Sequence, residues 1–360
     1  MSSLPRGRYL DRATPPHIST LIALTGIGAL SMNVFLPSLP AMAEYFNADY
    51  ALMQLSVSLY LAVNAVLQLF IGPISDRFGR RPVLLISLAL FSLATLGCIL
   101  APTAVSFLVF RMGQAVIVSG LVLGRAVVRD MVPQAEAASM IGYVTMGMAV
   151  VPMIGPAFGG VLDQAFGWQA NFILLLMAGL AVLALTWADL GETARSTTAS
   201  FRDQVREYPE LFASRRFWGY CLSATFASGA FFAFIGGAPF VGSDVFGLNS
   251  VQVGFAVGAP ALGYFTGNFI SGRYSVRKGV NWMITVGAMI STLGMIIPFV
   301  LALAGISTAL SFFGSVTLVG LGNGMLMPNA NAGMLSVRPH LAGSASGIGG
   351  AIMIFGGACL

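Results

Sequence analysis

Long uninterrupted apolar runs follow one another along the 360-residue chain, from about residue 18 to its last residue. Apolar residues fill these runs without alternating with polar ones, which favours helices over the strands of a membrane barrel. A helix rises about 1.5 Å per residue, so about 20 apolar residues cross about 30 Å of hydrocarbon. The pattern predicts eleven membrane spans: 18–40, 52–72, 82–101, 104–127, 140–163, 168–190, 216–241, 251–272, 281–303, 308–335 and 343–360.

The composition supports this fold class, an all-α polytopic membrane protein. Hydrophobic residues make up 57% of the chain and charged residues 9%, whereas soluble domains carry about 25% charged residues. So little charge cannot cover a water-facing surface, which argues against a soluble enzyme, a DNA-binding module and a disordered chain. The two histidines lie outside the apolar runs, and the three cysteines each lie within one. We therefore predict no metal site, no cofactor and no disulfide framework.

The basic residues are distributed unevenly across this topology. Seventeen of the 18 Lys and Arg residues fall in the N-terminal segment 1–17, in loops on its side of the membrane or at the span ends next to those loops, and only Arg111 lies deep within a span. The opposite loops carry acids but neither Lys nor Arg: Glu44, Asp49, Asp163 and Asp244. The positive-inside rule then predicts a cytoplasmic N-terminus and a multi-pass protein of the cell (inner) membrane. The asymmetry also explains the net charge of +5 without a nucleic-acid partner.

One alternative concerns Ala41-Met42-Ala43, which resembles a signal-peptidase site after an apolar stretch. The first run is long for a signal peptide, and the arginine cluster before it suits a retained helix equally well. We therefore expect a retained first span.

The longest polar stretch, 191–215, divides the spans into two groups. We predict an N-terminal six-helix bundle over 18–190, a cytoplasmic linker over 191–215 and a C-terminal bundle of five spans over 216–360. Within the linker, apolar residues recur every three or four positions. This spacing fits either a short amphipathic helix on the inner membrane face or a plain flexible linker.

A weak internal repeat supports two related halves. Ser75–Arg81 after the second span resembles Ser271–Lys278 after the eighth, at an offset of 196 residues. Duplicated bundles are common among membrane transporters. On this interpretation a complete protein has two pseudo-symmetric bundles of six helices, and this chain is truncated in its eleventh span.

The most specific motif is Gly72-Pro73-Ile74-Ser75-Asp76-Arg77-Phe78-Gly79-Arg80-Arg81-Pro82, between the second and third spans. Glycine permits a tight turn between two helices, and Pro82 is well placed to open the next helix. Asp76 can pair with a nearby arginine or cap a helix N-terminus. A charged loop that only sets topology is the alternative. We predict a conformational latch made of Gly72, Asp76, Arg77, Gly79, Arg80, Arg81, Arg129 and Asp130.

Small residues and a proline gather in the fifth span. They are Gly142, Gly155, Pro156, Gly159 and Gly160. Small residues let helices approach closely, and proline removes a backbone donor and kinks a helix. We predict a packed, bendable seam between the halves, with ordinary glycine-mediated packing as the alternative.

Arg111 lies in the fourth span, where a charge costs about 3 kcal/mol or more. Such a residue usually faces a cavity, although it can also extend toward the nearby membrane surface. Polar and aromatic residues on the first two spans could share this cavity. The predicted substrate-cavity residues are Arg111, Gln114, Asn33, Tyr60 and Asn64.

These motifs resemble those of the major facilitator superfamily. The loop motif is similar to its pattern Gly-x-x-x-Asp-Arg/Lys-x-Gly-Arg-Arg/Lys at every specified position. The fifth span resembles the drug-antiporter pattern Gly-x8-Gly-x3-Gly-Pro-x2-Gly-Gly, with Val151 in place of one glycine. Within the superfamily, Asn33–Pro40 and Gly124–Asp130 resemble the bicyclomycin-resistance (Bcr/CflA) drug-efflux family.

The resemblance implies an inner-membrane secondary transporter that exports small, mostly apolar drugs by proton-coupled alternating access. The first span departs from the family pattern, because Asn33 stands where an aspartate is expected and an amide cannot titrate. Uptake or uncoupled exchange of a small metabolite is therefore one alternative, and a truncated, non-transporting remnant is another. The expected partners are a small-molecule substrate, protons and the lipid bilayer. We expect a monomer, and no enzyme, because no span contains clustered catalytic side chains.

Overall fold

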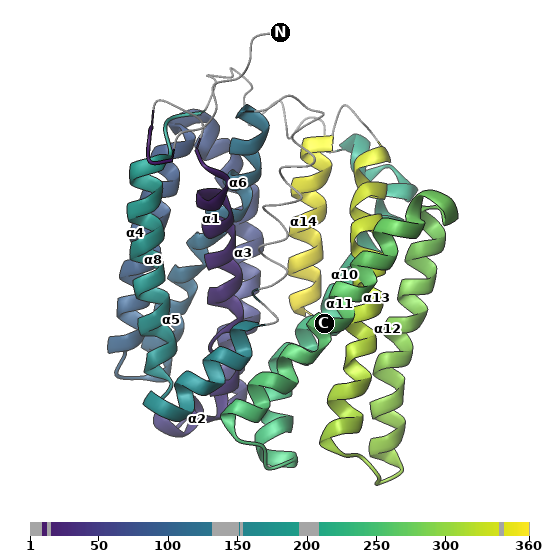
Figure 1. Ribbon diagram of the computed structural model, residues 1–360. Helices are drawn as coiled ribbons and strands as arrows, with labels where there is room; N and C mark the ends of the chain where they lie inside the picture. The colour runs from purple at the N-terminus through teal and green to yellow at the C-terminus, as the bar shows by residue number, and fades with distance from the viewer. Residues whose placement is uncertain are drawn as a thin grey trace.

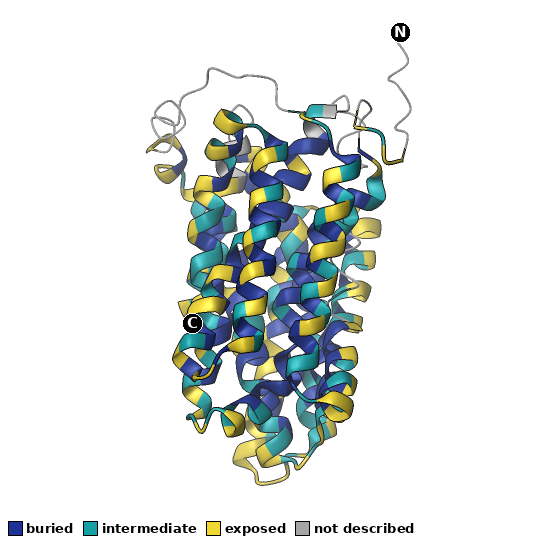
Figure 2. Ribbon diagram, turned by 90° about the vertical axis from the view of Figure 1, so that its left-hand side faces the viewer, coloured by how far each residue is buried: buried dark blue, intermediate teal, exposed yellow. Residues whose placement is uncertain are grey.

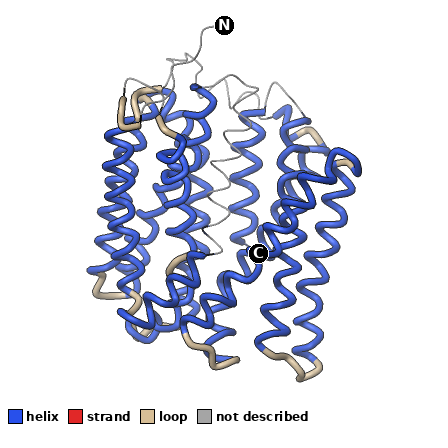
Figure 3. Tube along the Cα trace, in the orientation of Figure 1, coloured by secondary structure: helices blue, strands red, loops and turns tan. Residues whose placement is uncertain are grey.

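The computed structural model describes residues 9–12, 16–131, 151, 154–193, 209–337 and 342–359. Throughout these residues the regular secondary structure is helical, without a strand (Figure 3). Nine helical segments in the described part are long and apolar enough to cross a membrane. This confirms the predicted fold class, which follows from the need to satisfy every backbone hydrogen bond inside lipid.

The N-terminal half begins with a broken helix, in which Pro37 and Pro40 interrupt the apolar run after Asn33. Long helices follow, and residues 154–166 form a further helical segment. The labelled elements are α1 (Ile18–Asn33), η1 (Leu36–Ser38), α2 (Leu39–Tyr45), α3 (Tyr50–Phe78), α4 (Arg80–Leu100), α5 (Ala104–Gln114), η2 (Ala115–Ile117), α6 (Val118–Met131) and α8 (Gln169–Asp189).

The C-terminal half has the same helical character. Its elements are α10 (Arg215–Phe240), the short π-helical turn η3 (Val241–Val245), α11 (Ser250–Lys278), α12 (Val280–Leu303), α13 (Ala309–Val337) and α14 (Ala342–Cys359). Figure 1 shows the two groups of helices side by side, with α14 lying between them and α11 crossing obliquely toward α2.

The predicted spans agree with the helices in position, and they differ mainly at the ends. The second span was expected to end at residue 72, but α3 continues to Phe78. Residues 140–150, 152 and 153 of the fifth span lie outside the described residues, as does most of the predicted linker, 191–215. The eleventh span coincides with α14, whose described apolar part, Gly347–Cys359, is shorter than the other spans.

Apolar side chains cover the outward faces of the helices. On α12, Met289, Leu293, Ile296 and Val300 are exposed at spacings of three or four residues, so they share one face. Exposed positions run along the full length of the helices in Figure 2. Soluble proteins rarely expose contiguous apolar patches of this extent, so this surface fits the hydrocarbon of a bilayer.

The two halves repeat the same helix–turn–helix unit. Both α3 and α11 contain 29 residues, and each ends at a single glycine with positive φ, 95° at Gly79 and 87° at Gly279. Glycine suits this backbone because it has no Cβ to clash. The structural offset is therefore 200 residues rather than the 196 taken from the motif alignment, because the glycines, and not the serines, are equivalent.

Candidate functional site

The predicted latch residues lie at the arginine-rich end of the molecule, the end that carries Arg77, Arg80, Arg81, Arg277 and Lys278. Here Arg80 is the central residue. One of its terminal nitrogens lies 2.6 Å from an Asp76 carboxylate oxygen, and its Nε lies 3.3 Å from Asp130 Oδ2. The guanidinium also donates to the Ser75 hydroxyl. Arg80 therefore ties the end of α3 to the end of α6.

The motif does not form the loop that the sequence suggested. Asp76 and Arg77 belong to the last turns of α3, Gly79 is the whole connection, and α4 begins at Arg80. Pro82 is therefore the third residue of α4 rather than its opening residue. Gly72 is an interior α3 residue where an added Cβ would meet nothing within 4 Å, so its small size is not required by packing in this conformation.

The other predicted latch residues have different surroundings. Arg81 donates from Nε to the Leu190 carbonyl at 2.8 Å and from Nη2 to the Trp187 carbonyl at 3.2 Å. Arg77 is exposed and its guanidinium lies 5.3 Å from the centre of the Phe78 ring. The side chain of Arg129 lies outside the described residues.

Glu192 contributes to this site, and the sequence reasoning missed it. Its carboxylate accepts hydrogen bonds from the backbone N–H groups of Arg80 at 2.8 Å and Arg81 at 3.3 Å. These are unpaired N–H groups of the first turn of α4, where a negative charge is stabilised. Glu192 therefore fixes the start of α4 to the end of α8, next to the latch.

A second acid at the end of α8, Asp189, anchors the N-terminal segment. It is fully buried and accepts hydrogen bonds from the backbone N–H groups of Leu10 at 2.7 Å and His17 at 2.8 Å, and from the Thr20 hydroxyl at 2.6 Å. Three donors compensate for burying the carboxylate. The only sequence signal for this role was the pair of acids at the end of the sixth span.

Arg111 is completely buried in the N-terminal half. Its guanidinium donates to the Ser31 carbonyl at 2.9 Å, the Ser31 hydroxyl at 3.1 Å, the Ser56 carbonyl at 3.3 Å and Gln114 Oε1 at 2.7 Å. It also lies 4.4 Å from the centre of the Phe35 ring and 4.1 Å from that of Tyr60. The charge is thus held by carbonyl and amide oxygens and by two aromatic faces.

The structure brings three of the five predicted cavity residues together, Arg111, Gln114 and Tyr60, and places the two asparagines elsewhere. Asn33 donates to the Ala29 carbonyl at 2.7 Å and lies beside Gly155. Asn64 accepts a hydrogen bond from Gln68 at 2.9 Å. Substrate contact stays a prediction for all five residues, and in this conformation the Arg111 side chain is closed off from any open space.

The glycines of the fifth span lie against two different neighbours. A Cβ added to Gly159 would collide with the Val34 carbonyl group at the end of α1, and one added to Gly160 would collide with the Ser250 carbonyl group at the start of α11. From the other side, Gly254 of α11 packs against the backbone of Pro156. This segment therefore crosses α11 at backbone contact. Gly142 lies outside the described residues.

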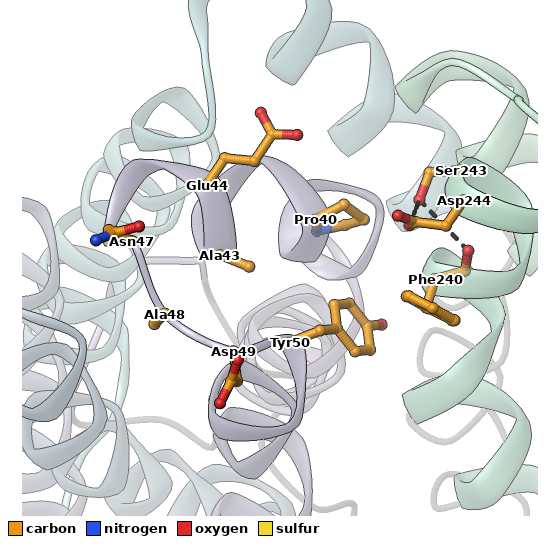
Figure 4. Close-up of a pocket in the computed structure, with 10 residues that line it drawn as sticks. All are labelled: Pro40, Ala43, Glu44, Asn47, Ala48, Asp49, Tyr50, Phe240, Ser243 and Asp244. Atoms are coloured by element: carbon orange, nitrogen blue, oxygen red, sulfur yellow. Dashed lines mark hydrogen bonds between the residues drawn. The ribbon is translucent and has the colours of Figure 1, made fainter.

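The two halves also meet at the acidic end, the end that carries Glu44, Asp49, Asp163 and Asp244. Tyr50 Oη donates to the Gly236 carbonyl at 3.0 Å, and the Tyr50 and Phe240 rings lie 5.1 Å apart. A pocket of about 480 Å³ opens beside them (Figure 4), lined by Pro40, Ala43, Glu44, Asn47, Ala48, Asp49, Tyr50, Phe240, Ser243 and Asp244. The pocket is therefore lined by residues of both halves.

Comparison with known proteins agrees with this architecture. The family described as Major Facilitator Superfamily matches residues 21–360. The chain is 30% identical to multidrug resistance protein D of Escherichia coli (strain K12), over 94% of this chain and 86% of that protein. It is 25% identical to a bicyclomycin resistance protein homologue of Haemophilus influenzae (strain ATCC 51907 / DSM 11121 / KW20 / Rd), over 95% of this chain and 88% of that protein.

A solved structure shares the fold. A bacterial homologue of the human lysosomal transporter Spinster, in an inward-facing and unoccupied conformation, superimposes with a TM-score of 0.77 at 18% identity. The match covers 94% of this chain and 79% of that one. The resemblance seen in the motifs is thereby confirmed at the level of the whole sequence and the whole fold. The chain belongs to the major facilitator superfamily of membrane transporters.

Proposed function

We propose that the protein is an inner-membrane exporter of small, mostly apolar drugs that works by proton-coupled alternating access. The arginine-rich end faces the cytoplasm in this proposal, because basic residues are retained on that side. The names of two relatives, a multidrug resistance protein and a bicyclomycin resistance protein homologue, support drugs as the substrate class. The protein acts as a single chain in the bilayer.

The observation that carries the mechanism is the position of the contacts between the halves. The Tyr50–Gly236 hydrogen bond and the Gly160–Ser250 and Gly254–Pro156 backbone contacts all lie toward the acidic end. The latch contacts of Arg80, in contrast, stay within the N-terminal half. Among the described residues, contacts between the halves at the acidic end, together with Arg80 ion pairs that stay within one half, support the inward-open state of a rocking carrier.

The face between the halves offers a surface suited to such a substrate. On α3, Asn64 and Gln68 are half-buried, and Gln68 lies near Gly350 of α14. On α10, Phe231 and Phe232 are half-buried, with ring centres 6.3 Å apart. Aromatic side chains with a few polar groups are typical of sites for apolar small molecules. We place the drug on this face.

Everted membrane vesicles test this function directly. With an imposed pH gradient, adding bicyclomycin or one of a panel of lipophilic drugs should discharge part of the gradient, and the drug should accumulate inside the vesicles. Vesicles without the protein are the control. If no compound in the panel accumulates or changes the gradient, the exporter proposal is wrong.

A second candidate, uncoupled exchange or uptake of a small metabolite, is favoured by the identity of Asn33. In the described part of the chain every acid lies at a helix end or in a loop, so no carboxylate is available at mid-membrane. We expect Asn33→Asp to give drug flux a new dependence on pH, because the buried position then titrates. Flux measured between pH 5.5 and 8.5 checks this, with Asn33→Ala as the control. An unchanged pH profile in both variants would favour exchange without protons.

The latch gives a prediction with an internal control. Asp76→Asn removes the charge that pairs with Arg80 at 2.6 Å, so we expect drug flux to fall several-fold while the amount of protein in the membrane is unchanged. Arg273→Gln is the control, because Arg273 is exposed at the same end of the molecule, lies outside the predicted latch and has no ion pair among the described residues. Equal flux in the two variants would remove the latch role of Asp76.

A further inference from the structure

Asp163 lies between the two halves at the acidic end, and neither the latch nor the substrate face uses it. It belongs to the helical segment 154–166, three residues after Gly160, and its exposed fraction is 8%. Its carboxylate faces the side chains of Ser38 and Ser250, and Gly160, one turn earlier on the same segment, packs against the backbone of Ser250. Ser38 belongs to η1 of the N-terminal half, whereas Ser250 is the first residue of α11 in the C-terminal half. One carboxylate therefore touches both halves.

The N-terminal half holds this carboxylate in place through a chain of buried polar groups. Asn171 Nδ2 donates to the Ser38 hydroxyl oxygen at 2.9 Å and to the Gly159 carbonyl at 3.2 Å. Asn171 and Ser38 are both fully buried. Because the Ser38 oxygen accepts from Asn171, its own hydroxyl hydrogen is free to be donated to Asp163. The position of the carboxylate is thus set by Ser38, Asn171 and the backbone of Gly159.

The contact on the other side depends on how α11 is placed. Asn249 caps α11, and it and Gln252 exchange reciprocal hydrogen bonds with each other's backbone N–H groups. These bonds fix the first turn of α11, in which Ser250 presents its hydroxyl to Asp163. A carboxylate is favoured at a helix N-terminus, where the peptide dipoles leave a partial positive charge. If α11 moved away, the Asp163 carboxylate would lose both the Ser250 hydroxyl and the N-terminus of α11 as neighbours.

Other charges at this end do not substitute for that contact. The acidic side chains on the neighbouring elements are Glu44 of α2, Asp49 before α3 and Asp244 of η3, and all three line the pocket at the acidic end. In the described part of this end there is neither a lysine nor an arginine. The Asp163 carboxylate consequently relies on hydroxyl donors and on the start of α11.

We propose that Asp163 is a clamp between the halves that holds the acidic end closed and so sets the balance between the inward-open and outward-open states. This role rests on the proposed alternating access, since it needs an outward-open state. Opening toward the acidic end separates Ser250 from Asp163, while Ser38 and Asn171 stay with it. Weakening the clamp therefore favours the outward-open state.

Distances between spin labels across the acidic end test this proposal. We would label Glu44→Cys and Val245→Cys in a cysteine-free full-length protein, because both positions are exposed and lie on opposite halves. The otherwise unmodified protein should show one dominant short distance by double electron–electron resonance. Asp163→Ala should raise the ratio of long to short distances at least tenfold, which corresponds to about 1.4 kcal/mol. An unchanged distribution would overturn the clamp.

Two further variants guard against misfolding and charge effects. Ser250→Ala removes only the contact of the C-terminal half at a half-buried position, and it should shift the distances in the same direction by a smaller factor. Asp49→Asn is the matched control, because it removes an exposed acid at the same end of the molecule and should leave the distances unchanged. A Ser250→Ala variant identical to the unmodified protein would also count against the clamp.

The same samples separate the clamp from the proposed function. If distances respond to Asp163→Ala but no drug is transported by the unmodified protein, the clamp stands and the exporter proposal fails. If drug flux is normal and the distances do not respond, the exporter proposal stands and the clamp fails.

Discussion

Replacing Arg111 with alanine should lower the stability of the protein more than any other single change to a predicted site residue. The guanidinium is completely buried and makes four hydrogen bonds to oxygens of Ser31, Ser56 and Gln114. Removing it takes away these four hydrogen bonds and opens a gap between the Phe35 and Tyr60 rings. We expect a loss of roughly 3 kcal/mol, because hydrogen bonds to charged groups are among the stronger ones and the desolvated charge offsets part of their gain.

Thermal unfolding of the purified protein in detergent measures this effect as a midpoint lowered by several degrees. Arg111→Lys should recover little of the loss, because an ammonium group lacks the planar fork that reaches α1, α3 and Gln114 together. Arg273→Ala is the control, since Arg273 is an exposed arginine at the arginine-rich end. An Arg111→Ala variant as stable as the control would show that the cluster does not hold the helices together. It would then favour the predicted role of Arg111 toward substrate.

The spans could be predicted because lipid leaves few alternatives for an apolar chain. Hydropathy reports where hydrocarbon ends, however, and not where a helix ends. This is why the second span was expected to stop at residue 72, whereas α3 continues through Asp76 to Phe78 into the polar region. Similarly, the first predicted span, 18–40, joins α1, η1 and the first two residues of α2 into one run, because its prolines change the backbone without ending the apolar stretch.

The candidate site was predictable where its partners are near in sequence. Asp76 and Arg80 are four residues apart on a continuous path of helix and turn, and they form the ion pair that the motif suggested. Glu192 reaches Arg80 across 112 residues, and Ser31 reaches Arg111 across 80. Such pairs depend on how helices pack, and a single serine or glutamate carries no sequence signal for its distant partner. For the same reason, the sequence identified Asp163 only as one of the acids on the side opposite the N-terminus, without its distant partners.

The largest effect on transport, in contrast to stability, is expected at Gly160. A Cβ there would lie 2.8 Å from the Ser250 carbonyl carbon and 3.1 Å from Val251 Cα. Both neighbours are backbone atoms of α11, so neither can rotate away as a side chain would. Gly160→Ala should therefore push α11 from the segment 154–166 and hold the acidic end partly open. We expect drug flux in everted vesicles to fall at least tenfold, with a thermal midpoint close to that of the unmodified protein.

The adjacent glycine makes this prediction specific to the seam between the halves. Gly159→Ala brings its Cβ against the Val34 carbonyl group, inside the N-terminal half, so it should lower the thermal midpoint rather than act mainly on flux. Gly219→Ala serves as the neutral control, because a Cβ at Gly219 of α10 meets nothing within 4 Å. If Gly160→Ala transported as well as Gly219→Ala, close contact between the segment 154–166 and α11 would not be required for the transport cycle. If instead Gly159→Ala lowered mainly the thermal midpoint and Gly160→Ala mainly the drug flux, Gly159 would be required for the stability of the fold and Gly160 for the movement between the halves.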